Sequence, residues 1–181
     1  MPRASAAQSQ QLQGLRADVL AEMLSIGMIG EQEHQRLLSV NLGVLRSNAT
    51  QRHGATRWRA DGRGNLEVEV VDLNPHLLNE QWLDYAAFVL FHEYLHVLGY
   101  RVHNRTFRSL EARWPNATAS GRGKAFTHAR RLARASWHWV CPTCEERYPR
   151  QRKGRGRFMC RHCKTVPVSY THLTLPTKVT V

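Results

Sequence analysis

Apolar residues near the start of the chain recur at helical spacing. The repeat predicts a helix over residues 9–25, and a second helix is predicted over residues 31–39. Residues 1–8 lack such a pattern and are expected to be disordered. Residues 40–45 predict a first strand. The apolar positions of the first helix are Leu12, Leu15, Val19, Leu20 and Met23.

The next segment predicts a β-hairpin. Residues 56–60 and 65–71 read as strands, and the glycine-containing turn at residues 61–64 lies between them. Because side chains alternate between the two faces of a strand, one face should be buried and the other wet. The apolar positions of the second strand are Leu66, Val68 and Val70. This hairpin is the candidate edge strand for holding a substrate extended.

Residues 80–98 are rich in apolar side chains at helical spacing and contain the motif His-Glu-Tyr-Leu-His. His92 and His96 are four residues apart, so they share one face of a helix and can bind one metal ion. Glu93 is placed to act as general base on a metal-activated water that attacks a peptide carbonyl. The alternative is that carbonyls or carboxylates simply satisfy the two histidines.

A catalytic zinc ion needs a third protein ligand and an open position. Gly99 can end the helix in a left-handed cap, and a further helix is predicted from about residue 104. His103 is the preferred third ligand, and Glu111 on the following helix is the alternative. The spacing of the metzincin motif would place the third ligand at Val102, which argues against that class.

All four cysteines lie near the end of the chain in two Cys-x-x-Cys pairs, which are Cys141, Cys144, Cys160 and Cys163. This spacing is typical of a structural zinc site with four thiolate ligands. The alternative, two disulfides, requires an oxidising compartment, and the first residues do not read as an export signal. We therefore expect two zinc ions, one catalytic and one structural.

The chain has 181 residues and a formal net charge of +12, with 42% hydrophobic residues. This content excludes wholesale disorder, and no apolar run could span a membrane. Residues 1–119 are neutral, whereas residues 120–167 carry 13 Lys+Arg and two Glu. Such a block favours a nucleic acid partner. The candidate contacts are Arg150, Arg152, Lys153, Arg155 and Arg157. Trp137 and Trp139 could stack on bases, although at least one should pack internally.

These motifs together resemble the SprT-like zinc metalloprotease family, which includes the Spartan-related proteases. The resemblance covers about residues 10–166 and rests on the His92–His96 motif, on His103 followed by Phe107, and on the four-cysteine ribbon. It implies an α+β fold with a small zincin-type core, an active-site helix and a β-hairpin, followed by a zinc ribbon. It also implies zinc bound by the three histidines and DNA-associated substrates. The ubiquitin- and clamp-binding tails of eukaryotic members have no counterpart.

We expect a protease core over residues 9–119, a basic linker helix over 120–136 and a zinc ribbon over 137–167. Residues 168–181 resemble the translation of a sequencing adapter, which would mean that the natural C-terminus is missing. The expected function is a zinc-dependent endopeptidase acting on DNA-associated or DNA-crosslinked proteins. Its partners would be a protein substrate and DNA, with no membrane, and it would be a cytoplasmic, nucleoid-associated monomer. The alternative is a non-enzymatic DNA-binding zinc protein whose histidine site is structural.

Overall fold

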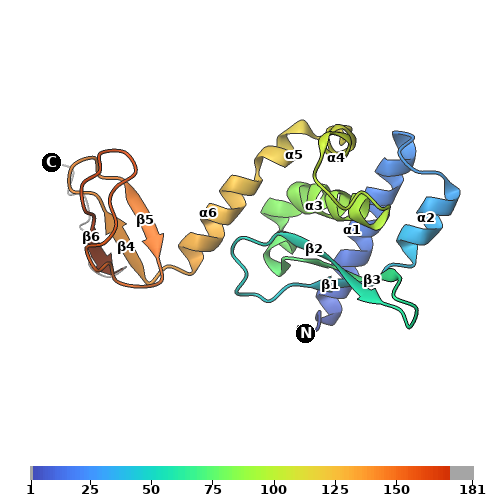
Figure 1. Ribbon diagram of the computed structural model, residues 1–181, viewed down its shortest axis with the longest axis horizontal. Helices are drawn as coiled ribbons and strands as arrows, with labels where there is room; N and C mark the ends of the chain where they lie inside the picture. Colours follow the sequence, from blue (N-terminus) through green and yellow to red (C-terminus); the bar gives the residue numbers. More distant parts are fainter. Residues whose placement is uncertain (1, 172–181) are drawn as a thin grey trace. The chain divides into compact units, whose positions relative to one another are not determined.

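A computed structural model describes residues 2–171, and this part of the chain contains six α-helices and two three-stranded sheets (Figure 1). The chain is thus α+β, as predicted. It divides into two compact units, one extending to Phe126 and the other beginning at Thr127. Over the residues described, none of the helices has the length and apolar character needed to cross a membrane.

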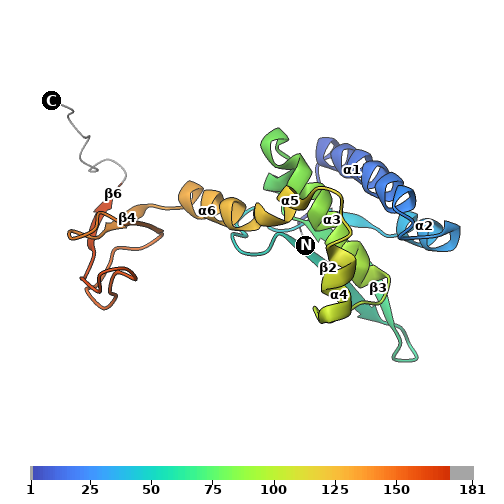
Figure 2. The same cartoon turned by 90° about the horizontal axis from the view of Figure 1, so that it is seen from above.

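The first unit combines five helices with one sheet. The strands are ordered β1-β3-β2, with β1 parallel and β2 antiparallel to β3, so β2 lies at the edge. Helices α1 and α3 pack against each other and against the sheet (Figures 1 and 2). The elements are α1 (Ala6–Ser25), α2 (Glu31–Leu38), β1 (Leu42–Val44), β2 (Gly54–Ala60), β3 (Leu66–Leu73), α3 (Leu83–Val97), α4 (Arg105–Glu111) and α5 (Ala117–Gly121), with short 3-10 turns at Pro75–Leu78 and Glu80–Trp82.

Helix α1 begins three residues before its predicted start. The Ser5 side chain accepts from the Gln8 backbone N–H, and the Gln8 side chain accepts from the Ser5 backbone N–H. This reciprocal capping box satisfies two N–H groups that a helix start leaves unpaired. The expectation of disorder over residues 1–8 is therefore wrong for residues 6–8. The predicted apolar face is buried in the core, as expected.

Strand β3 differs from the simple alternation that the sequence predicts. Arg57 pairs with Val70 but Trp58 pairs with Val68, so the register shifts by one residue at Glu69. Such a bulge exchanges the faces on its two sides. As a result Val68 packs against the same core as Val71 and Leu73, on the far side of the bulge. Leu66, at the end of β3 nearest the turn, is on that face too but is 49% exposed.

Helix α6 (Gly123–Ala133) corresponds to the predicted basic helix. Its Phe126 is fully buried and contacts the rings of Trp82 and Tyr85, which places the start of this helix in the first unit. The second unit contains β4 (Trp137–Val140), β5 (Arg147–Arg150) and β6 (Val168–Thr171) in the antiparallel order β5-β4-β6. The adapter-like tail thus starts with a strand paired to β4, and residues 172–181 lie outside the described residues.

Candidate metal centres

Three histidines converge in the first unit. His92 and His96 come from α3, and His103 comes from the loop that leads to α4. The Nε2 atom of His103 lies 3.1 Å from the Nε2 atoms of both His92 and His96. Two nitrogens bound to one tetrahedral zinc at ~2.0–2.1 Å would be about 3.3 Å apart. The three side chains are therefore spaced to bind one metal ion.

The outer ring nitrogens of two of these histidines have acceptors of their own. His92 Nδ1 lies 2.6 Å from Glu111 Oε1, and His96 Nδ1 lies 2.8 Å from the carbonyl oxygen of Tyr100. Because a carbonyl can only accept, His96 must carry its proton on Nδ1, and the carboxylate favours the same tautomer in His92. The Nε2 lone pairs then face one another, an arrangement that a cation stabilises.

Local structure fixes where these histidines lie. Helix α3 ends as predicted, with Gly99 at a φ of +107°. The N–H of Gly99 donates to the His96 carbonyl and that of Tyr100 to the Leu95 carbonyl, which is the Schellman pattern. The Phe107 ring is buried, with its centroid 4.7–4.9 Å from those of all three histidines. The Phe107 ring thus packs against all three imidazole rings and restricts their orientations.

Glu93 is buried beside this cluster, with 6% of its surface exposed. Its Oε2 accepts a hydrogen bond of 2.8 Å from Thr56 Oγ1 on β2. Gly54 allows this close approach, since a Cβ there would lie 2.6 Å from Glu93 Oε1. Burial raises the pKa of Glu93, and the hydrogen bond from Thr56 opposes that shift. Among the described residues, the side chain of Thr56 donates to Oε2 and no hydrogen bond to Oε1 is present.

A cavity of about 400 Å³ opens in front of the three histidines. One wall is the edge strand β2, which contributes Thr56 and Trp58, and the other includes Arg101 from the loop after α3. The Arg101 guanidinium lies 4.4 Å from the ring centroid of Trp58. The candidate metal position is therefore accessible, as a catalytic site requires and a closed structural site does not.

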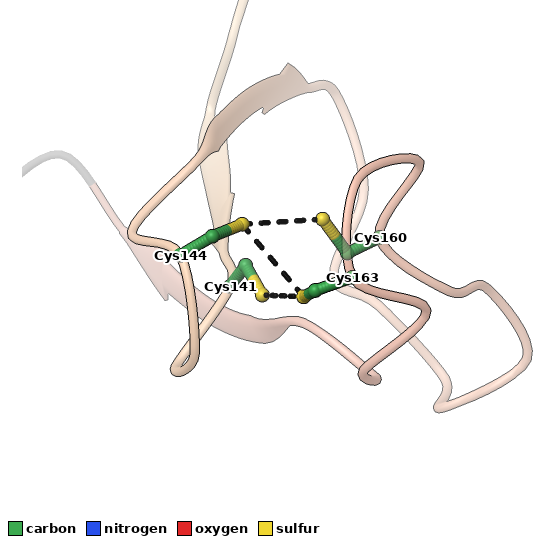
Figure 3. Close-up of side chains that lie close together, drawn as sticks. All are labelled: Cys141, Cys144, Cys160 and Cys163. Atoms are coloured by element: carbon green, nitrogen blue, oxygen red, sulfur yellow. Dashed lines mark hydrogen bonds between the residues drawn. The ribbon is translucent and has the colours of Figure 1, made fainter.

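The four cysteines form a second cluster, in the second unit. Figure 3 shows their sulfur atoms pointing toward one another from two loops. The Sγ–Sγ distances are 3.1 Å for Cys141–Cys163, 3.5 Å for Cys144–Cys160 and 3.7 Å for Cys144–Cys163. All four are free thiols, and these distances exceed a disulfide bond of ~2.05 Å. They approach the ~3.8 Å expected between thiolates on one tetrahedral zinc.

The two cysteine pairs have the same backbone design. The N–H of Cys141 donates to the carbonyl of Glu146, and the carbonyl of Cys141 accepts from the N–H of Glu145. In the second pair, the N–H of Cys160 donates to the carbonyl of Thr165, and its carbonyl accepts from the N–H of Lys164. Glu145 and Lys164 both adopt positive φ, 58° and 63°. Hydrogen bonds with Thr165 lower the pKa of Cys163 to about 6, whereas the pKa of Cys144 is raised to about 12, so the thiolate that a metal requires is favoured at Cys163.

Aromatic and basic side chains gather on the same unit. They line a cavity of about 1090 Å³, which contains all five basic residues singled out in the sequence and also Trp137, Trp139 and Phe158. Arg150 lies 4.9 Å from the Trp139 ring centroid, and Lys153 lies 5.9 Å from that of Trp137. Trp139 is buried, as expected for one of the two tryptophans, whereas Trp137 is partly exposed.

The structure brings together His92, His96 and His103, with Glu93 beside them. Glu111, the alternative third ligand, instead contacts Nδ1 of His92 and lies outside the three-histidine cluster. Sequence reasoning missed Thr56 and Gly54, because their roles depend on contacts with a helix more than thirty residues away. Comparison with protein-family models, curated proteins and solved structures finds no match.

Proposed function

We propose that this chain is a zinc-dependent endopeptidase of the zincin type, related to the SprT-like family. The observation that carries the proposal is the accessible three-histidine cluster with a buried glutamate beside it and an edge strand along its cavity. A purely structural metal site would have no use for the open face or for the adjacent glutamate.

The chemistry divides between the metal and the protein. Zinc at this position would polarise a peptide carbonyl and lower the pKa of a bound water to ~7. Glu93 takes the proton from the water at Oε1, because Thr56 already occupies Oε2. It then donates that proton to the nitrogen of the departing amine. Its raised pKa suits both roles, since a general base that is too weakly basic cannot accept the proton.

The edge strand supplies the substrate site. Within the described part of the chain, strand β2 is hydrogen-bonded only to β3, on one of its two sides, and its residues line the cavity. An extended peptide can add to the other side of β2 through main-chain hydrogen bonds, which hold it without regard to its sequence. In that arrangement a backbone carbonyl of the peptide would face the histidines.

The decisive experiment compares wild type with Glu93→Gln, using the full chain loaded with zinc and a labelled unfolded protein as substrate. The variant should keep its metal and lose cleavage by about a hundredfold or more, because an amide cannot accept the proton. Glu67→Gln on β3 is the matched control, since Glu67 is exposed and outside the cavity. Undiminished cleavage by Glu93→Gln would refute the mechanism.

We further propose that the second unit binds single-stranded DNA and thereby directs the protease to DNA-associated or DNA-crosslinked proteins. The basic residues and Trp137 in one cavity support this, because bases stack on aromatic rings while arginines contact phosphates. Affinity should fall steeply with salt concentration. Replacing Trp137 by alanine should weaken binding by about 1–3 kcal/mol per stacked base. A shallow salt dependence would contradict the proposal.

The competing function is a non-enzymatic DNA-binding protein with a structural metal at the histidines. The close spacing of the three histidine ligand atoms is compatible with this function, because a metal can be bound at such a site for stability alone. The two functions differ in one measurement. If zinc-loaded protein with DNA cleaves no substrate and behaves as Glu93→Gln does, the non-enzymatic function holds.

A further inference from the structure

The cavity in front of the histidines has an uneven charge. Among its lining residues Glu93 is the only carboxylate, and it is buried and held by Thr56. Arg101 is the only permanent cation, and it is exposed. A cation bound by the histidines would add to its positive potential. Arg101 is therefore the only charged side chain in the exposed part of this lining.

Arg101 is held in place without an acidic partner. No carboxylate within the described residues forms an ion pair with it, and its guanidinium instead lies over the Trp58 ring at 4.4 Å. Its backbone is fixed by neighbours in the chain, since its N–H donates to the Gly99 carbonyl and His103 follows two residues later. An arginine stacked on an indole keeps its N–H groups free at the edge, where they can bind a carboxylate through two hydrogen bonds.

The strand geometry gives the position of this pair relative to the reacting groups. Thr56 and Trp58 are two residues apart on β2, and both line the cavity. Two residues of extended chain advance by about 6.6 Å. A peptide lying along β2 with its carbonyl near Glu93 would thus present a side chain one or two residues away to Trp58 and Arg101.

We propose that Arg101 and Trp58 form a specificity subsite that selects an acidic side chain within two residues of the cleaved peptide bond. The inference rests on the proposed endopeptidase function. The aliphatic part of a substrate glutamate would pack on the indole, and its carboxylate would meet the guanidinium. A phosphate of nucleic acid is the other anion that an arginine could bind, but the pair lies beside the histidines on the strand that holds the peptide.

The test uses binding, so it does not depend on turnover. Fluorescein-labelled short peptides that differ only in one Glu, Gln or Lys are titrated against zinc-loaded full-length Glu93→Gln protein. The glutamate peptide should bind about tenfold more tightly than the glutamine peptide, as one charge-assisted pair implies. Adding Arg101→Glu should reverse the order, so that the lysine peptide binds best, and Arg101→Gln should abolish the preference.

Arg59→Glu is the matched control. Arg59 is an exposed arginine on the same strand, outside the cavity lining, so it makes the same charge change without touching the subsite. It should leave the peptide order unchanged. The proposal would be overturned if the Glu93→Gln protein that keeps Arg101 bound all three peptides with equal affinity. It would also be overturned if Arg59→Glu changed the order of peptide affinities as much as Arg101→Glu does. So would an Arg101→Glu variant that keeps the peptide preference but loses affinity for a single-stranded oligonucleotide.

Cleavage mapping with wild-type protein separates this failure from failure of the proposed function. Sites cut next to acidic residues, and redistributed by Arg101→Glu, support both. Cleavage at sites with no preference for neighbouring acidic residues would refute the specificity subsite but would still support the endopeptidase function. An absence of cleavage would refute the protease, and the binding order would still decide whether the cavity prefers a carboxylate.

Discussion

Replacing Glu111 by alanine should weaken metal binding at the three histidines while leaving the four-cysteine site unchanged. The Glu111 Oε1 atom lies 2.6 Å from His92 Nδ1, and the two side chains are only 27% and 24% exposed. A charge-assisted hydrogen bond of this kind contributes ~1.5–3 kcal/mol, and partial exposure favours the lower half of that range. Because 1.36 kcal/mol corresponds to a factor of ten, the dissociation constant should rise about 10- to 50-fold.

The assay is a titration of the metal-free protein with Co²⁺ or Zn²⁺ against a chelator of known affinity. Thiolate ligands give Co²⁺ charge-transfer absorption that histidines do not give, so the two sites can be followed separately. Glu111→Gln keeps an acceptor for Nδ1 and should lose less affinity than Glu111→Ala. Glu80→Ala, which removes an exposed carboxylate elsewhere, is the control. An unchanged affinity in Glu111→Ala would refute the argument that this residue orients His92.

Two further substitutions test how β2 holds Glu93. Thr56→Val removes a hydrogen bond that lowers the pKa of Glu93, so that pKa should rise. The acidic limb of the pH profile of kcat/KM should then move to higher pH. Thr56→Ser keeps the hydroxyl and should leave the profile unchanged. Gly54→Ala places a Cβ 2.6 Å from Glu93 Oε1, so urea unfolding should show a loss of about 1–3 kcal/mol together with lost cleavage. Its control, Gly14→Ala in α1, meets nothing within 4 Å and should stabilise by roughly 0.5–1 kcal/mol.

Several features of this protein follow from residues close together in the chain. A helix repeats every 3.6 residues, so His92 and His96 share a face in any helix that contains them. Gly99 ends that helix because few other residues adopt its backbone conformation. The Cys-x-x-Cys pairs likewise form their own knuckles through hydrogen bonds within five residues.

The tertiary structure alone assigned the roles that depend on distant contacts. His103 and Glu111 were both possible third ligands, and only the packing of α4 placed Glu111 behind His92. The bulge at Glu69 changed which residues of β3 enter the core, because strand register depends on the partner strand as well as on the local pattern.

The surroundings of Glu93 and Arg101 show the same division. The sequence places both residues near the metal-binding motif. Their contacts with Thr56 and Trp58 exist because α3 packs on an edge strand from another part of the chain. Local sequence spacing thus identified His92, His96 and the four cysteines as candidate ligands, since it acts over a few residues. The surroundings that we propose for proton transfer and substrate binding came from tertiary packing, since they join segments that only the folded core brings together.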